Sequence, residues 1–237
     1  MTALRAVSFD AAGTLVHPAR PVGDIYARLA ARHGVHADPA EIERRFRRAF
    51  AAAPPLAFPG AEAAAVRAHE KAWWRALVTE VFGDTPFRGF DAYFEALFAF
   101  FASAAAWRCD PDAVPLLRQL RARGLAILVV SNSDARLHAV LDALGLRPAI
   151  DRITISSEVG AAKPDPRIFA TALAAAGLEP AEVVHVGDTP HEDHAGARAA
   201  GLDAVLVGGA EVAARAPGAV VVGRLGDVGP LLARVRR

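Results

Sequence analysis

The sequence is poor in cysteine and in lysine. Cys109 is the only cysteine among 237 residues, so no disulfide can form within the chain. A single free cysteine is typical of proteins from a reducing compartment. Lysine occurs only as Lys71 and Lys163, and arginine supplies the other basic side chains. Each of the two lysines is therefore examined below for a specific role.

The chain also lacks a large net charge and long apolar runs. Its formal net charge is +1, which does not favour binding to nucleic acid or to a membrane surface. No apolar run reaches the roughly 20 residues of a membrane-spanning helix, and the N-terminus has no basic-then-apolar signal pattern. We therefore predict a cytoplasmic protein with no nucleic-acid partner and no membrane partner.

The first notable stretch runs from Leu4 to Leu15. Its apolar start predicts a short buried strand of a parallel sheet, and the Ala-Ala-Gly-Thr segment after Asp10 predicts a tight turn. Asp10 thus stands at the carboxyl end of a strand, where open α/β sheets bind their ligands. Asp10 either takes part in chemistry there or only caps the turn.

Two kinds of pattern divide the rest of the chain. Between His17 and about Ala106 four apolar stripes have helical spacing, and no strand is expected. From Cys109 on, short apolar strands alternate with helices, which predicts a parallel sheet with helices on both faces. The strands are expected near residues 126–130, 153–155, 183–186, 204–207 and 220–222, and the helices near 111–123, 135–144, 166–176 and 195–200.

We therefore predict an α/β fold with a Rossmann-like parallel sheet core and an inserted all-helical cap domain. Residues 1–16 and 107–237 would form the core, since the first strand must pair with the later ones. Residues 17–106 would form the cap, inserted after the first strand and placed over the carboxyl edge of the sheet. Most aromatic residues fall in this insert, where they form the helix core or line a substrate pocket.

Polar residues follow three of the predicted strands. The first strand ends at Asp10, the second at Ser131 and Asn132, and the third at Asp188, with Asp193 five residues later. Lys163 precedes a predicted helix and belongs to the same edge of a parallel sheet. Crowded carboxylates repel one another, and a divalent cation and a lysine relieve that repulsion. Mg²⁺ suits Asp10 and Asp188, and the whole set suits phosphoryl transfer with an attacking aspartate.

These motifs resemble those of the haloacid dehalogenase-like hydrolase superfamily, and the resemblance covers nearly the whole chain. The matching segments are Phe9-Asp10-Ala11-Ala12-Gly13-Thr14-Leu15, Ser131-Asn132, Lys163-Pro164 and Gly187-Asp188 through Asp193. The insert resembles the family's helical cap. The Trp73-Trp74 pair and the sequence as a whole are most similar to the rhythmically-expressed-gene-like branch of this superfamily.

The resemblance implies a role for each motif. Asp10 would be the nucleophile, the Ser131 hydroxyl would hold the substrate phosphate, and Lys163 would orient both. Asp188 and Asp193 would bind Mg²⁺ together with Asp10 and the Ala12 carbonyl. Gly13, Thr14 and Asn132 would contact the substrate. It is expected to be a small phosphorylated molecule, or another small anion.

One position departs from the phosphatases of this family. They carry a second aspartate two residues after the nucleophile, and this chain has Ala12 there. A methyl group cannot protonate a leaving alcohol, and general acid–base help is worth about 10²–10⁴ in rate. We therefore expect slow turnover of ordinary phosphate esters unless another group substitutes.

Several residues keep two interpretations. His17, His191 and His194 either substitute for the missing acid or are ordinary polar residues. The His-x-x-His spacing of His191 and His194 also fits a zinc site. Asp193 is a metal ligand or a partner of metal-bound water. Lys71 forms a Schiff base, as in phosphonoacetaldehyde hydrolases, or is a surface lysine. The arginines at 44, 45, 47 and 48 bind an acidic group or form a solvated helix face.

Three functions remain open for the whole chain. The first is a Mg²⁺-dependent phosphatase with reduced or specialised activity. The second keeps the fold with other chemistry, phosphonate or haloacid cleavage; the retained Gly187-Asp188 argues against dehalogenation. The third is a catalytically impaired phosphate-binding or regulatory protein. The intact Asp10, Lys163 and Asp188 favour an enzyme.

Overall fold

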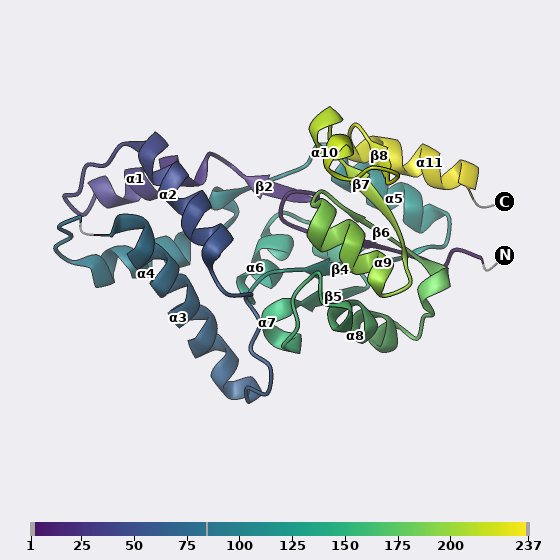
Figure 1. Ribbon diagram of the computed structural model, residues 1–237, viewed down its shortest axis with the longest axis horizontal. Helices are drawn as coiled ribbons and strands as arrows, with labels where there is room; N and C mark the ends of the chain where they lie inside the picture. The colour runs from purple at the N-terminus through teal and green to yellow at the C-terminus, as the bar shows by residue number, and fades with distance from the viewer. Residues whose placement is uncertain (1–2, 84, 236–237) are drawn as a thin grey trace.

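A computed structural model describes residues 3–83 and 85–235. The strands are β1 Ala6–Phe9, β2 Val16–Pro18, β3 Trp107–Cys109, β4 Ala126–Ser131, β5 Arg152–Ile155, β6 Val183–Gly187, β7 Asp203–Val207 and β8 Val220–Val222. The helices are α1 Val22–Ala31, α2 Pro39–Ala52, α3 Ala63–Phe82, α4 Phe90–Phe100, α5 Ala113–Ala122, α6 Arg136–Ala143, α7 Ser156–Val159, α8 Pro166–Ala176, α9 Gly196–Ala199, α10 Ala210–Arg215 and α11 Val228–Val235. Helices α1 to α4 lie at one end of the molecule, and the sheet and both termini lie at the other (Figure 1).

The core is a six-stranded sheet in the order β5-β4-β1-β6-β7-β8, with every neighbouring pair parallel. The chain goes from β1 to one side for β4 and β5, and then to the other side for β6 to β8. β1 therefore lies at the point where the strand order reverses, which is where such sheets open a ligand crevice. The predicted α/β fold with a Rossmann-like core and a helical insertion is confirmed.

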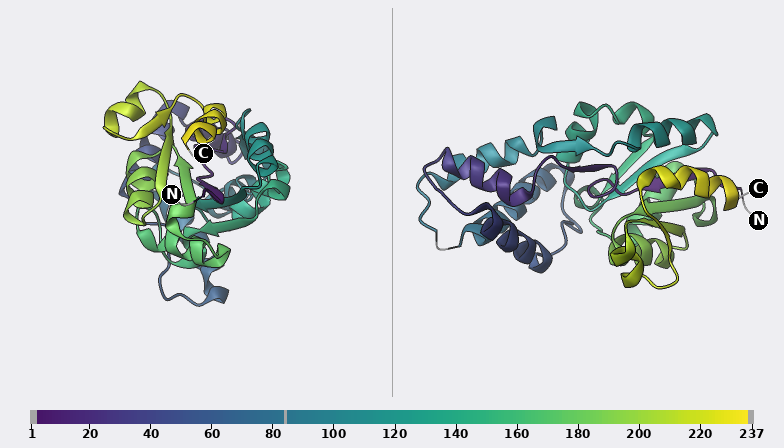
Figure 2. Two further views of the ribbon diagram at one scale, coloured as in Figure 1. Left: turned by 90° about the vertical axis from the view of Figure 1, so that its right-hand side faces the viewer. Right: turned by 90° about the horizontal axis from the view of Figure 1, so that it is seen from above.

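Helices cover both faces of this sheet (Figure 2). Val7 and Phe9 of β1 pack with α5, α6 and α11, whereas Ala6 packs on the other face with α8 and α9. All four residues of β1 are buried, because a parallel strand between two helical layers has no solvent-facing side. A fully buried strand holds the residue that follows it, Asp10, in one position.

Helices α1 to α4 form the predicted four-helix insert and have an apolar core of their own. Tyr26, Phe82 and Tyr93 are among its most deeply buried side chains, each at most 2% exposed. The expectation of no strand in this part of the sequence is wrong at its edge. β2, which includes His17 and Pro18, pairs antiparallel with β3. Backbone hydrogen bonds between β2 and β3 thus join the two segments that connect the insert to the core. A strand of three residues is too short for an apolar pattern to predict it.

Buried polar contacts join the insert to the core. Glu70 of α3 is only 2% exposed. Its carboxylate accepts hydrogen bonds from the Ser157 hydroxyl at 2.6 Å and from the Ala135 amide at 3.1 Å. Because both donors belong to the core, this one carboxylate holds α3 against the start of α6 and against α7.

The predicted helix over residues 195–200 needs a correction. A π-helical turn, Pro190–Ala195, comes first, and the α-helical part α9 covers only Gly196–Ala199. The wider turn follows from side-chain bonding at the site, described below. The helices predicted near 111–123, 135–144 and 166–176 are confirmed as α5, α6 and α8.

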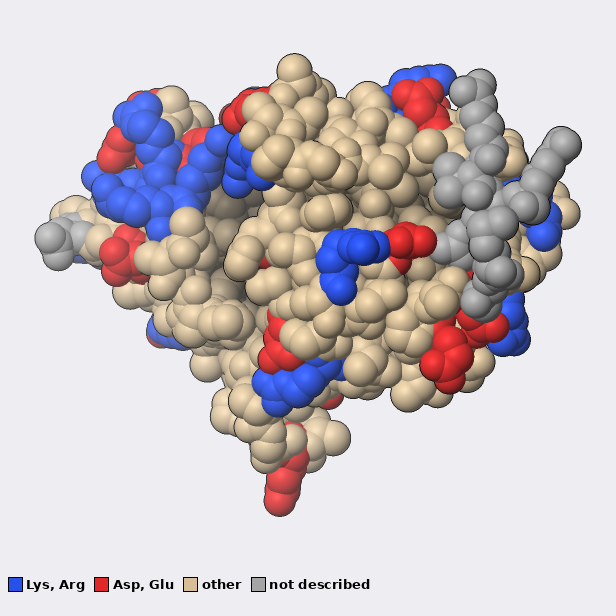
Figure 3. All heavy atoms as spheres, turned by 45° about the vertical axis from the view of Figure 1, so that its right-hand side comes forward, with Lys and Arg blue, Asp and Glu red and all other residues tan. Residues whose placement is uncertain are grey.

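Two surface properties bear on possible partners. In the described part of the chain, no helix combines the length and apolar character needed to cross a membrane. On the face shown in Figure 3, basic side chains gather at the upper left, toward the helical insert, with acidic side chains among them, and elsewhere the two kinds lie in small mixed groups.

Candidate active site

Asp10 is buried at the carboxyl end of β1, directly beside the end of β4. Its side chain is 8% exposed. Its Oδ1 atom accepts a hydrogen bond from the Ser131 hydroxyl at 2.9 Å and one from Lys163 Nζ at 2.7 Å. The pairing of β1 with β4 brings Asp10 and Ser131 together across 121 residues of sequence. The structure therefore brings three of the predicted site residues, Asp10, Ser131 and Lys163, into contact.

Lys163 is fixed from both its backbone and its side chain. Asn132 accepts a hydrogen bond from the Lys163 amide at 2.7 Å and donates one to the Lys163 carbonyl at 2.9 Å. The ammonium group also donates to Asp193 Oδ1 at 2.6 Å, and its side chain is 1% exposed. Although burial lowers it, the nearby charges of Asp10 and Asp193 raise the pKa of Lys163 above its ordinary value. Lys163 is thus a buried cation between two carboxylates.

Asp193 explains the π-helical turn. Its Oδ2 atom accepts hydrogen bonds from the amides of Asp188 at 3.0 Å and Thr189 at 2.8 Å. Oδ1 contacts Lys163 and, at 3.2 Å, Nε2 of His185. The side chain therefore folds back over the start of its own turn, and only glycine fits at 187, because a Cβ there would lie 2.1 Å from the Asp193 carboxyl carbon.

Asp188 follows β6 and lies against the turn after Asp10. The Thr14 hydroxyl donates a hydrogen bond to Asp188 Oδ1 at 3.0 Å. Gly13 has φ of +105°, and a Cβ there would approach the Asp188 carboxylate to 2.6 Å. Gly13 and Thr14 thus contact Asp188 in this structure. Their predicted substrate contact remains a prediction, as does that of Asn132, whose side chain bonds to Lys163 and lines the cavity described below.

The three carboxylates form a compact cluster. Asp10, Asp188 and Asp193 each offer an oxygen within 4.8 Å of the others, and in residues 3–83 and 85–235 no other group of three or more acidic, histidine or cysteine side chains does so. Burial, together with repulsion from neighbouring carboxylates, raises the pKa of Asp10 to about 6, against the opposing charge of Lys163. Burial and the charge of Asp193 raise the pKa of Asp188 to about 6. The pKa of Asp193 is lowered: burial raises it, but Lys163 and His185 outweigh burial.

This cluster fits a divalent cation. One ammonium group faces three carboxylates, and burial together with repulsion among these carboxylates raises the pKa values of Asp10 and Asp188. Hard oxygen ligands and excess negative charge are what Mg²⁺ requires of a protein site. The acceptor atoms of Asp193 are already engaged by Lys163, His185 and two amides, so Asp10 and Asp188 have more acceptor capacity left for a cation.

Mg²⁺ affinity is expected to depend on pH near 6. Protons bind Asp10 and Asp188 more tightly than ordinary carboxylates, so they compete with the cation at a higher pH. Below pH 6 the dissociation constant should rise by about tenfold per pH unit for each proton displaced, and above pH 7 it should level off. Calorimetric titration with Mg²⁺ at pH 5, 6, 7 and 8 measures this. If the Mg²⁺ affinity did not change between pH 5 and pH 8, the assignment would be wrong. The matched control is the Asp188→Asn variant, which should bind Mg²⁺ more weakly at every pH.

Other candidates lie in ordinary contacts. His17 bonds to Asp110 at 3.2 Å, and the His191–His194 pair belongs to no metal-type group in the described residues. Lys71 forms an exposed ion pair with Glu95, which supports its interpretation as a surface lysine. Among the arginines of α2, those at 44, 45 and 47 pair with acidic side chains of the same helix, as a solvated helix face does.

Sequence reasoning missed the buried support behind the site. His185 of β6 is fully buried, contacts Asp193 through Nε2 and bonds through Nδ1 to the Ser8 hydroxyl of β1 at 2.9 Å. The sequence did contain an indication of this contact. Ser8 and His185 each lie in an otherwise apolar strand, and a buried polar side chain needs a hydrogen-bond partner. Glu192 was also missed: burial raises its pKa, and its neighbours in the structure include Lys163, Asp193 and Asn132.

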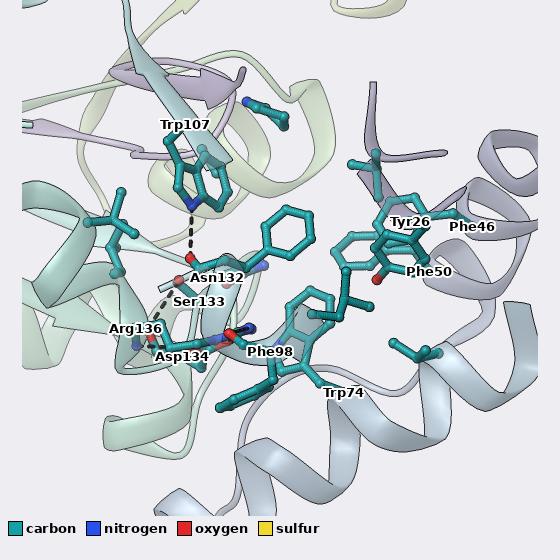
Figure 4. Close-up of a pocket in the computed structure, with 18 of the residues that line it drawn as sticks. Tyr26, Phe46, Phe50, Trp74, Phe98, Trp107, Asn132, Ser133, Asp134 and Arg136 are labelled. Carbon is teal, nitrogen blue, oxygen red and sulfur yellow. Dashed lines mark hydrogen bonds and ion pairs between the residues drawn. The ribbon is translucent and has the colours of Figure 1, made fainter. Parts of the chain in front are cut away.

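A cavity of about 360 Å³ opens beside Ala12 and Gly13, between the helical insert and the core. Figure 4 shows Asn132, Ser133, Asp134 and Arg136 on the core side, with Tyr26, Phe46 and Phe50 of the insert facing them. The first turn after the candidate nucleophile therefore meets a partly open space that can hold a small molecule. A parallel sheet with a buried aspartate at its switch point, a partnered lysine and a helical insert is the arrangement that the resemblance to haloacid dehalogenase-like hydrolases implies.

Comparison with known proteins agrees with this class. A family model described as haloacid dehalogenase-like hydrolase matches residues 4–201, and the chain belongs to this family. Haloacid dehalogenase-like hydrolase domain-containing protein 3 of Bos taurus is 37% identical over 212 residues, covering 88% of this chain and 83% of that protein. The rhythmically expressed gene 2 protein of Drosophila melanogaster is 27% identical over 218 residues, covering 87% of this chain and 84% of that protein, so the predicted branch is confirmed.

Two further similar proteins have names that state an enzymatic activity. Phosphoserine phosphatase of Thermus thermophilus is 41% identical over 111 residues, which is 46% of this chain and 44% of that protein. The crystal structure of L-2-haloacid dehalogenase from Xanthobacter autotrophicus superimposes with a TM-score of 0.74 at 20% identity, covering 98% of this chain and 99% of the other. The latter likeness shows the fold.

Proposed function

We propose that this hydrolase is a Mg²⁺-dependent phosphatase that cleaves a phosphate monoester through an aspartyl-phosphate on Asp10. The observation that carries the proposal is the position of Asp188. This second carboxylate lies against the turn after Asp10, and burial and the charge of Asp193 raise its pKa to about 6, so a cation bound there would offset the crowded negative charge. The phosphoserine phosphatase that matches part of the chain supports the same reaction class.

In this scheme the hydrogen bond from Lys163 to Oδ1 orients the Asp10 carboxylate, Oδ2 is the attacking atom, and the Ser131 hydroxyl, which donates to Oδ1 in this structure, turns to the substrate when it binds. The bond from Oδ2 to phosphorus forms as the ester P–O bond breaks, and the leaving oxygen keeps the electron pair and takes a proton from water to give the alcohol. Water then attacks phosphorus, and inorganic phosphate and the free carboxylate are released. Ser131, Asn132 and the backbone amides after Asp10 hold the phosphate oxygens, and Gly13 and Thr14 shape that turn.

Asp10, Asp188 and the Ala12 carbonyl would hold Mg²⁺, which offsets negative charge on the phosphoryl oxygens when it is bound. Asp193 contributes mainly by fixing Lys163 and the amides of Asp188 and Thr189. Residues 1–16 and 107–237 act as the catalytic core, and residues 17–106 act as the cap that encloses a small anionic substrate.

Haloacid cleavage is the second candidate, because Ala12 leaves the site without a proton donor at that position and a halide needs none. It predicts halide release from 2-chloropropionate that is insensitive to EDTA. The phosphatase predicts no halide release, so the two functions are separated by one pair of assays.

The direct test is phosphate release from 4-nitrophenyl phosphate with Mg²⁺ and with EDTA. This leaving group is acidic and needs little proton donation, so the native chain should turn it over with Mg²⁺ and lose turnover with EDTA. Asp188→Asn should lower turnover and raise the Mg²⁺ concentration needed. Equal rates with Mg²⁺ and EDTA, or no phosphate release, would refute the proposal.

A further inference from the structure

The cavity beside Ala12 has almost entirely apolar walls. Aromatic side chains of all four helices of the insert and of β3 line it, among them Tyr26, Phe46, Phe50, Trp74, Phe98 and Trp107. A space of about 360 Å³ is more than twice the roughly 150 Å³ that accommodates a benzene ring in an apolar protein cavity. The group that occupies it next to the phosphate is therefore apolar and can be as large as two fused rings.

The charged side chains that line the cavity neutralise each other. Arg136 donates to both oxygens of Asp134, at 2.9 and 2.6 Å, and its guanidinium lies over the rings of Phe98 at 4.0 Å and Trp74 at 4.9 Å. The Trp74 indole also donates to Asp134 at 2.5 Å. Asp134 and Arg136 are the charged residues of the cavity wall and are paired with each other, so an ammonium or carboxylate on the leaving group would lose hydration there without meeting an unpaired opposite charge. A phosphorylated amino acid does not fit this wall.

No group of the cavity wall is suited to protonate a leaving alkoxide. Ala12 is exposed to the cavity and carries a methyl group. Of the titratable wall residues, Asp134 is held ionised, since its contacts with Arg136 and Trp74 outweigh burial and lower its pKa. Burial raises the pKa of Tyr26, the phenol of the wall, which makes it a weaker acid. The leaving group must therefore depart as an anion that is stable in itself.

Together the walls and Ala12 define the substrate class. We infer that, within the proposed phosphatase function, the substrate is the monophosphate of an uncharged phenol, with one or two aromatic rings in the cavity. The bond from Asp10 to phosphorus forms, the aryl P–O bond breaks, and the aryloxide keeps the electron pair and takes its proton later from water. This inference narrows the proposed function and deviates from the phosphoserine phosphatase that matches part of the chain.

A substrate series tests the inference, with kcat/KM measured in Mg²⁺ for 1-naphthyl, phenyl and benzyl phosphate and for phosphoserine. Phenyl phosphate should exceed benzyl phosphate by about 10²-fold or more, because the benzyl alkoxide needs an acid that is missing. The second ring should favour naphthyl over phenyl phosphate by about tenfold or more. Phosphoserine should be the poorest of the four.

The outcomes distinguish a failure of the inferred substrate class from a failure of the proposed phosphatase function. Phosphoserine equal to or better than phenyl phosphate, or benzyl equal to phenyl phosphate, would overturn the inference while the phosphatase stands. No phosphate release from any of these or from 4-nitrophenyl phosphate would overturn both.

Phe50 provides a variant with little risk to the fold, because this wall residue is 48% exposed. Phe50→Ala removes part of the ring-binding wall and should raise KM for 1-naphthyl phosphate, lowering its advantage over phenyl phosphate about 2- to 10-fold with kcat little changed. Phe58→Ala is the matched control, since Phe58 packs on His69 outside the cavity wall and should leave the naphthyl-to-phenyl ratio unchanged. An unchanged ratio in Phe50→Ala, or an equal drop in both variants, would overturn the assignment of the cavity.

Discussion

Asp10→Asn is expected to lower turnover of 4-nitrophenyl phosphate by a factor on the order of 10⁴–10⁶, the scale seen when a covalent nucleophile is removed. The amide is a poor nucleophile and cannot form the aspartyl-phosphate. It can still accept the hydrogen bonds that Ser131 and Lys163 now donate to Oδ1. The loss is therefore expected to be chemical, and it is measured as initial rates at saturating Mg²⁺.

A control variant separates chemistry from folding. Asp142→Asn makes the same change on the exposed side of α6 and should leave turnover unchanged. The Asp10→Asn protein should keep a cooperative thermal transition, because its burial and its donors are preserved. Turnover of Asp10→Asn at more than a tenth of the native rate would refute the covalent scheme.

Ala12→Asp is expected to raise kcat/KM for benzyl phosphate by about 10²–10⁴, the usual worth of a positioned general acid. The site has room for the larger side chain, because Ala12 is exposed and lines the cavity. Phenyl phosphate should gain less, since its leaving group needs less protonation. The variant would thus narrow the gap between alkyl and aryl substrates, as measured by parallel rates on the two esters.

Ala12→Asn is the matched control, since it has nearly the same size and cannot transfer a proton. Equal gains in Ala12→Asp and Ala12→Asn would assign the effect to packing, and no gain in Ala12→Asp would show that proton donation does not limit alkyl esters here. A bell-shaped pH profile that appears only in Ala12→Asp would identify the new acid directly.

The buried ion pairs around Lys163 determine which substitutions can test the chemistry without unfolding the protein. Lys163 neutralises one of the carboxylates it touches, and Asp193 is in turn held by His185 and two amides. Removing a partner from a buried charge pair leaves the other charge uncompensated and is strongly destabilising. Variants of Asp10 and Ala12 leave the bond between Lys163 and Asp193 intact, which is why they test chemistry better than variants of Lys163.

Most of the fold was predictable because it depends on local patterns. The apolar runs before Asp10, Ser131 and Asp188 became β1, β4 and β6, and the four apolar stripes of the insert became α1 to α4. Helices α10 and α11 near the C-terminus went unpredicted, since segments of six and eight residues span only about two turns and leave little periodicity to detect. The three-residue pairing of β2 with β3 depends on two segments that are far apart in sequence.

The sequence by itself determined which chemical groups meet at the edge of the sheet: Asp10, Ser131 and Asp188 were identifiable from residue type and from the strand before each, and Lys163 from the helix that follows it. Only the tertiary structure decided how these groups share charge, because contacts such as Ser8 with His185 and Lys163 with Asp193 join residues 30 to 177 positions apart. The cavity is likewise a product of tertiary structure. Aromatic residues of α1, α2, α3 and α4 have the same apolar spacing whether they form the core of the insert or a wall, and only the packing of those helices on the core separates the two.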